Sequence, residues 1–245
     1  MRRRRRLEDE VEAALRTVID PELDRSIQEL GFARAVVGPG GEVTVELRLP
    51  TYWCAPNFVF MMAQDARDAV EAVAGVRSVR IELPDHFAAD EIADGLVRRH
   101  PFDEVFSGLA DGSGLDQLRR LFWAKGLMVW QERLARRLLL AGRSVEELAA
   151  MRLGEVDPHD PDLPGYVARR ARLSISVDPS APLIVYPNGR PVGPERLLPY
   201  LDRCRLVAVS LRANAELCQR LHATRFAPSS PTGASPADPA TEVTT

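Results

Sequence analysis

Cysteines, aromatic residues and long apolar runs are all scarce in this chain. Only three of its 245 residues are cysteines, an odd number at wide spacing that excludes a disulfide framework. Aromatic residues make up 6% of the chain, which leaves few surfaces on which single-stranded nucleic acid could stack. No apolar run approaches the roughly 18 residues that a membrane-spanning helix needs. We therefore expect a reduced, cytoplasmic protein that has neither a nucleic acid nor a membrane as its partner.

Lysine is almost absent as well, because Lys125 is the only lysine and all other basic side chains are arginines. The formal net charge is −3, whereas a protein that binds polyanions in general usually carries a strongly basic domain. The basic run Arg2–Arg6 leads into acidic residues at 8–10 rather than into an apolar segment. This start is not typical of a secretory signal.

Residues 7–84 carry the pattern of a small α+β domain. Apolar residues at helical spacing alternate along the chain with segments of period-two alternation. The predicted elements are a helix at 7–18, strands at 32–37 and 42–49, a helix from Pro56 to Val73, and a strand at 76–83. The glycine-rich segment 38–41 between the first two strands is a hairpin loop and lacks the spacing of a phosphate-binding loop. This order predicts a compact sheet with helices on one face.

The remainder of the chain predicts a linker, a second domain and a tail. Residues 85–114 are interpreted as a linker that includes a short helix at 90–99 and a flexible joint at 111–114. Residues 115–226 predict a mixed helical and β domain, and residues 227–245 have a composition typical of disorder. Within the second domain we expect long helices from Leu115, a capping box of Ser144 and Glu147, strands at 173–177, 183–186 and 206–211, a turn at 187–189, and a last helix to about Arg225.

Cys54 lies between the end of a predicted strand and the start of a predicted helix. Unpaired N–H groups and the positive end of the helix dipole favour a thiolate at such a position. A thiol there is a better metal ligand or nucleophile than a cysteine in an apolar core. Placement alone is equally compatible with a small buried apolar residue.

The segment Asp20-Pro21-Glu22, taken alone, indicates a turn with solvated acidic side chains. The chain continues with Ser26-Ile27, Leu30-Gly31, the hairpin, Thr51 and Cys54 before a helix that starts at Pro56, and a strand that begins Gly-Val. In this order and spacing, residues 7 to about 84 resemble the iron–sulfur cluster assembly domain of the SufT-like and PaaD-like proteins. That family has an α+β fold, and its members assist the maturation of Fe–S proteins as late carriers or targeting factors.

The resemblance implies roles for several side chains. Cys54 would be the thiol that handles iron or a cluster, Asp20 and Glu22 the acidic turn near it, and Thr51 a neighbouring hydroxyl. Thiolates bind iron and clusters, and carboxylates can take part in harder, transient coordination of iron. The family usually has proline directly after the cysteine, whereas Ala55 intervenes here. A specialised branch of the family is therefore a plausible interpretation.

One cysteine cannot hold a cluster, because clusters usually take about four protein ligands. Cys204 and Cys218 lie in the other half of the chain without a CxxC spacing, and we interpret both as structural. A bound cluster would need a homodimer, a partner protein, glutathione or carboxylate ligands. Transient handover of iron or an Fe–S cluster to a client fits one thiol better than storage. By analogy with PaaD-like proteins, the client could be a bacterial multicomponent oxygenase or its Fe–S reductase.

Two other functions stay open from the residues. The chain could be an interaction module or chaperone for a metalloenzyme, with Cys54 packed and inert. It could also be a thiol-dependent enzyme, which would need a histidine within hydrogen-bond reach of Cys54. His86 is the only nearby candidate in the sequence; it could alternatively be a second metal ligand or an ordinary histidine of a surface loop.

Overall fold

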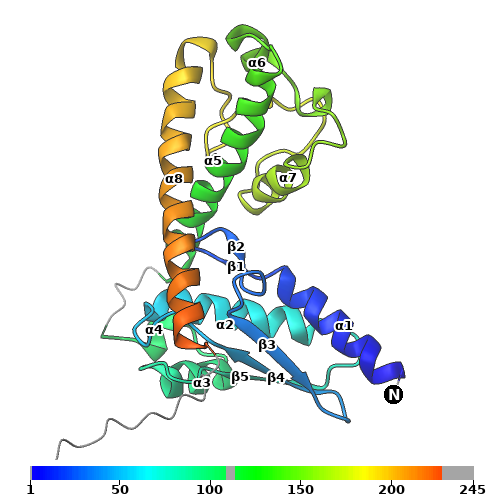
Figure 1. Ribbon diagram of the computed structural model, residues 1–245, viewed down its shortest axis with the longest axis vertical. Helices are drawn as coiled ribbons and strands as arrows, with labels where there is room; N and C mark the ends of the chain where they lie inside the picture. Colours follow the sequence, from blue (N-terminus) through cyan, green and yellow to red (C-terminus); the bar gives the residue numbers. More distant parts are fainter. Residues whose placement is uncertain (1, 109–113, 228–245) are drawn as a thin grey trace, which may run out of the picture.

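The computed structural model describes residues 2–108 and 114–227. The first part of the chain forms the predicted αββαβ unit (Figure 1). Its elements are α1 (Arg2–Arg16), β3 (Ala33–Val37), β4 (Glu42–Leu47), α2 (Pro56–Glu71) and β5 (Ser78–Glu82). The strand order is β3-β4-β5, with β3 and β4 antiparallel and β4 and β5 parallel. The α+β fold class is confirmed.

Local sequence signals explain why these elements begin and end where they do. Pro56 occupies the first turn of α2, where its missing N–H has no intrahelical partner to lose. Gly41 closes the hairpin between β3 and β4 with a φ of +89°, and a Cβ there would lie 2.4 Å from the carbonyl oxygen of Gly75. Glycine is the residue that tolerates both conditions. On β4, Val43, Val45 and Leu47 alternate into the core against α1 and α2.

Two features of the first unit go beyond the sequence pattern. A two-residue ladder of β1 (Ile19–Asp20) and β2 (Arg25–Ser26) closes the acidic turn. Residues 85–114, expected as a linker, contain α3 (Ala89–Arg98) and α4 (Phe102–Val105). Both helices bury apolar side chains in the same core as the sheet, among them Ile92, Leu96 and Phe102. Residues 111–113 of the expected joint lie outside the described residues.

The second part of the chain is helical. It comprises α5 (Asp116–Leu140), α6 (Val145–Ala150), the short 3-10 turn η1 (Leu153–Glu155), α7 (Leu163–Arg172) and α8 (Pro194–Arg225). A second hydrophobic cluster lies between these helices and the segment 183–185. The capping box at the start of α6 is confirmed, because Ser144 accepts from the Glu147 N–H and Glu147 accepts from the Ser144 N–H. The turn at 187–189 is confirmed as well.

The three strands predicted for this part are wrong. Residues 206–211 lie inside α8, since a short apolar run cannot by itself distinguish a strand from a helix. Residues 183–185 are all buried, and they form only an isolated β-bridge. Prolines at 182, 187 and 191 lack the N–H groups that a β-ladder needs as hydrogen-bond donors. Residues 173–177 follow the end of α7 and turn at Ser174, which has a φ of 58°.

Helix α8 connects the two hydrophobic clusters. Its first half contributes Leu197, Leu201 and Cys204 to the second cluster, and its second half contributes Ala215 to the first. Figure 1 shows this long helix running beside α5 and ending at the α+β unit. No helix in the described part of the chain combines the length and apolarity needed to cross a membrane. The predicted disordered tail lies, from residue 228 onward, outside the described residues.

Candidate functional site

Cys54 lies in the loop between β4 and α2, two residues before the first residue of the helix. Its side chain is half-buried, and its Sγ lies 3.3 Å from the Oγ1 of Thr51, so one of the two groups donates a hydrogen bond to the other. The structure thus brings together the thiol and the hydroxyl that the sequence placed in one site.

His86 fixes the backbone of Cys54 rather than its thiol. The Ala88 N–H donates to Nδ1 over 3.2 Å, which leaves the proton of the neutral ring on Nε2. Nε2 then donates to the carbonyl oxygen of Cys54 over 2.8 Å. Burial lowers the pKa of His86 most, and the hydrogen bond to Cys54 opposes that effect. The side chain is only 5% exposed, so the interpretation as a surface-loop histidine is wrong.

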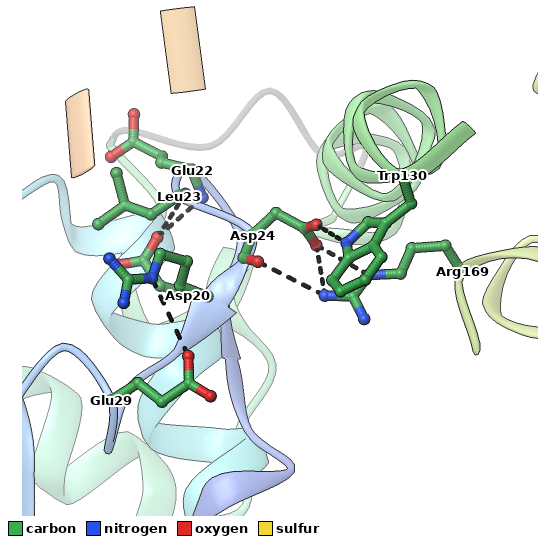
Figure 2. Close-up of polar contacts among 8 residues, drawn as sticks. Asp20, Glu22, Leu23, Asp24, Glu29, Trp130 and Arg169 are labelled. Atoms are coloured by element: carbon green, nitrogen blue, oxygen red, sulfur yellow. Dashed lines mark hydrogen bonds and ion pairs between the residues drawn. The ribbon is translucent and has the colours of Figure 1, made fainter. Parts of the chain in front are cut away.

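Asp20 is buried at the start of the acidic turn rather than solvated. Its side chain is 6% exposed, and Oδ1 accepts the N–H groups of Glu22 and Leu23 over 2.9 and 3.0 Å (Figure 2). Burial raises the pKa of Asp20 to about 7, and the two N–H groups offset only part of that rise. The sequence did not indicate this burial or the raised pKa that it causes.

Glu22 stays exposed on the turn, as expected. The loss of part of its hydration to surrounding protein atoms raises the pKa of its carboxyl, and the positive charge of Lys125 on α5 lowers it. The only lysine of the chain therefore lies close to the acidic turn.

Asp24 is an anchor that sequence reasoning missed. Its Oδ2 accepts from Trp130 Nε1 over 2.8 Å, and its Oδ1 accepts from Arg169 Nη2 over 3.0 Å (Figure 2). Asp24 has a φ of 50°, a conformation that aspartate adopts more readily than most residues. These contacts attach the acidic turn to α5 and α7. Partners 106 and 145 residues away give no local signal in a sequence.

Cys218, which we interpreted as structural, lies on α8. It is half-buried against the first hydrophobic cluster, as Cys54 is. The pKa of the Cys218 thiol is raised to about 11, and burial is the largest cause. The negative charges of Asp20, Cys54 and Glu22 raise it as well. Cys204 is buried in the second cluster instead.

Exposed aromatic side chains border the loop of Cys54. Trp53 is 74% exposed, Tyr52 45% and Phe87 46%. The rings of Tyr52 and Trp53 meet edge to face with centroids 5.1 Å apart, and Tyr52 lies 6.1 Å from Phe87. Aromatic side chains that form a patch on a surface are typical of sites that contact a partner.

The donor side chains are not assembled into a closed metal site. Among residues 2–108 and 114–227, no three His, Cys, Asp or Glu side chains form a group that could hold a metal ion as they stand. The described residues offer a thiol and a hydroxyl in contact before the start of α2, and two carboxyls on the acidic turn.

Comparison with known proteins shows that the segment with these residues matches a protein family. The family described as iron-sulfur cluster assembly protein matches residues 8–83. A protein of Porphyromonas gingivalis named Fe-S protein maturation auxiliary factor is 40% identical over 78 residues, which are 31% of this chain and 71% of that protein. An uncharacterized protein of Methanocaldococcus jannaschii is 32% identical over 92 residues, 37% of this chain and 95% of that protein. No solved structure matches the chain.

The matched segment contains β1 to β5, α2 and most of α1, and it includes Asp20, Glu22, Thr51 and Cys54. The loop with the half-buried thiol is thus part of the matched segment, whereas α5 to α8 lie outside it. On this basis the chain belongs to the family of iron–sulfur cluster assembly proteins.

Proposed function

We propose that this protein is a maturation factor that passes iron or an Fe–S cluster to a client metalloenzyme, with Cys54 as the receiving thiol. The observation that carries the proposal is the loop of Cys54: its thiol contacts the Thr51 hydroxyl, and its backbone is held by His86. A thiolate at a helix start binds iron readily, and a half-buried one remains within reach of a partner.

Iron or the cluster is the cargo of this reaction and not a resident cofactor. Cys54 supplies one soft ligand, and the carboxyls of Asp20 and Glu22 supply harder ones nearby. A cluster usually needs about four protein ligands, so a second molecule has to complete its coordination during transfer. That molecule is the client, another assembly protein or a second copy of this chain.

The family resemblance supports a finer version of the proposal. The chain would act in the cytoplasm as a SufT-like or PaaD-like factor, and its client would be a multicomponent oxygenase or the Fe–S reductase of one. Residues 7–84 would handle the cargo, and the helical part within 115–226 would recognise the client. The acidic turn is attached to that helical part through Asp24, which would hold the thiol in a fixed position relative to a bound client.

A second candidate function is favoured by the exposed aromatic rings at the site. Tyr52, Trp53 and Phe87 would suit a module that only docks on a metalloenzyme and leaves Cys54 inert. A thiol-dependent enzyme has less support, because the His86 ring donates to the carbonyl oxygen of Cys54 and not to the sulfur.

Anaerobic reconstitution with ferrous iron and sulfide separates the first two functions. Wild-type protein is expected to develop the visible absorbance of a cluster or bound iron, and the Cys54→Ala variant is expected to lose it. Cys204→Ala is the matched control, because Cys204 lies in the other hydrophobic cluster. Equal absorbance for wild type and Cys54→Ala, or full client activity in a strain that carries only Cys54→Ala, would contradict the proposal.

A further inference from the structure

Arg170 on α7 is a buried cation without an anionic partner. The residue is only 1% exposed. It forms no ion pair with any residue in the ranges 2–108 and 114–227, whereas the preceding Arg169 pairs with Asp24 at 3.0 Å. A guanidinium stays protonated in proteins, so Arg170 keeps its charge in spite of its burial. Because a buried charge is costly unless an opposite charge compensates it, this residue indicates an anionic ligand.

The hydrogen bonds of Arg170 use only one of its three guanidinium nitrogens. Nη1 donates to the carbonyl oxygens of Pro182 and Leu183 over 2.8 and 3.4 Å, and to the Tyr166 hydroxyl over 3.3 Å. Nε is buried without a partner, and Nη2 donates to no residue that the structure describes. Nε–H and one N–H of Nη2 run parallel, and this edge of a guanidinium binds both oxygens of a carboxylate or phosphate group. The fold therefore leaves the bidentate edge of Arg170 unused.

Arg170 lines a groove between the first half of α5 and the segment 173–191 that follows α7. The groove has a volume of about 880 Å³, which is within the range of small-molecule sites. Arg120 from α5 and Arg190 also line it; both are exposed, and neither has an ion pair in the described part of the chain. The residues that line the groove include no aspartate or glutamate. Three arginines without a nearby acid give the groove a positive potential in a chain whose net charge is −3.

The remaining wall of the groove is apolar or neutral. Leu121, Leu173 and Ile175 supply apolar side chains, and Gln117 and Asn188 supply neutral polar ones. Small-molecule sites typically combine such an apolar lining with a few polar or charged groups that fix the orientation of the ligand. The groove thus suits a molecule that has an acidic head and an apolar body.

We propose that this groove binds a small organic anion, with its carboxylate or phosphate head on the free edge of Arg170 and its body against the apolar wall. The head displaces no hydrogen bond of the fold, because Nη1 keeps its carbonyl acceptors. Arg120 and Arg190 attract the anion and supply further donors. The inference goes beyond the proposed function, since the groove lies outside the matched segment 8–83 and does not involve Cys54.

Isothermal titration calorimetry of the full-length chain with phenyl phosphate and with benzoate tests the proposal, at an ionic strength held constant with NaCl. The two probes share an apolar ring and differ in the acidic head, so their comparison shows which head the site prefers. Inorganic phosphate and acetate are the matched probes without the ring. We expect saturable binding of at least one ring-bearing probe, and about tenfold weaker binding of the same head without its ring. No saturable binding of either ring-bearing probe would overturn the proposal.

Three variants locate the binding in the groove. Arg170→Lys keeps the charge but loses the parallel donors, so we expect its affinity to fall about tenfold or more. Arg120→Gln leaves the buried residue intact and should weaken binding by about twofold to fivefold. Arg143→Gln is the matched control, because Arg143 is exposed in the same helical part but outside the groove, and it should bind as wild type does.

The variants can contradict the proposal in two ways. Unchanged affinity in Arg170→Lys, or in Arg120→Gln if Arg170→Lys does not fold, would overturn it. Equal weakening by Arg120→Gln and Arg143→Gln would show that the probes respond only to the overall charge of the protein, and this result would overturn it as well.

Discussion

Replacing Asp20 by asparagine should change how the stability of the protein depends on pH. The carboxyl is buried, and its Oδ1 accepts two backbone N–H groups that an asparagine oxygen can also accept. The substitution therefore keeps the turn and removes the ionisation. The variant stays neutral at every pH, whereas the wild-type carboxyl has to be ionised in the buried turn when the pH is high.

The size of this change in stability follows from the pKa of Asp20 in the folded and in the unfolded state. It is about 7 in the folded protein, against about 3.9 for an aspartate in an unfolded chain. A group whose pKa is raised by folding contributes its full stabilisation below the unfolded value and loses it as the pH rises through the folded value. A difference of about three pKa units corresponds to about 4 kcal/mol. Relative to the variant, wild type should therefore lose about 4 kcal/mol between pH 4 and pH 8.

Urea unfolding followed by circular dichroism at a series of pH values measures this difference. Asp9→Asn is the matched control, because Asp9 is exposed on α1 and undergoes the same chemical change. The free energy of unfolding of Asp9→Asn should follow that of wild type at each pH. If Asp20→Asn also follows wild type across this range, Asp20 is ionised throughout and the reasoning from its burial is wrong.

Three further substitutions test other contacts. His86→Ala leaves the Cys54 carbonyl and the Ala88 N–H without their partner. We expect the free energy of unfolding to fall by about 1–3 kcal/mol and the Cys54 thiol to be alkylated faster. An unchanged alkylation rate would show that His86 does not position the loop. Asp24→Ala leaves Arg169 unpaired where both side chains are 10% exposed, and should lower the free energy of unfolding by about 3 kcal/mol in urea. Ser144→Ala removes an exposed helix cap and should cost about 1 kcal/mol, measured by the same assay.

The elements of the α+β unit could be predicted because their signals are local. Alternating valines on β4, Pro56 at the start of α2 and the glycine that turns the hairpin each act within a few residues. The capping box at Ser144 was predictable for the same reason. The strand predicted at 183–186 failed because periodicity reports which side of a segment is buried, and residues 183–185 are buried on all sides.

The candidate site was predictable only in part, because its parts come from distant segments. Thr51 and Cys54 are three residues apart, and the sequence placed them together. The burial of Asp20 and the contacts of Asp24 depend on packing that includes α5 and α7, which no local pattern encodes.

Helix α8 belongs to a part of this chain that its archaeal relative is too short to contain. The match covers 95% of the Methanocaldococcus jannaschii protein but only 37% of this chain, so that relative has no room for a counterpart of α8. A single assembly unit with one thiol has to obtain further ligands from another molecule. In this chain α8 ends on the loop of Cys54 and is fixed there by Arg225. The helical part would then hold the loop of Cys54 in place while another molecule supplies the further ligands.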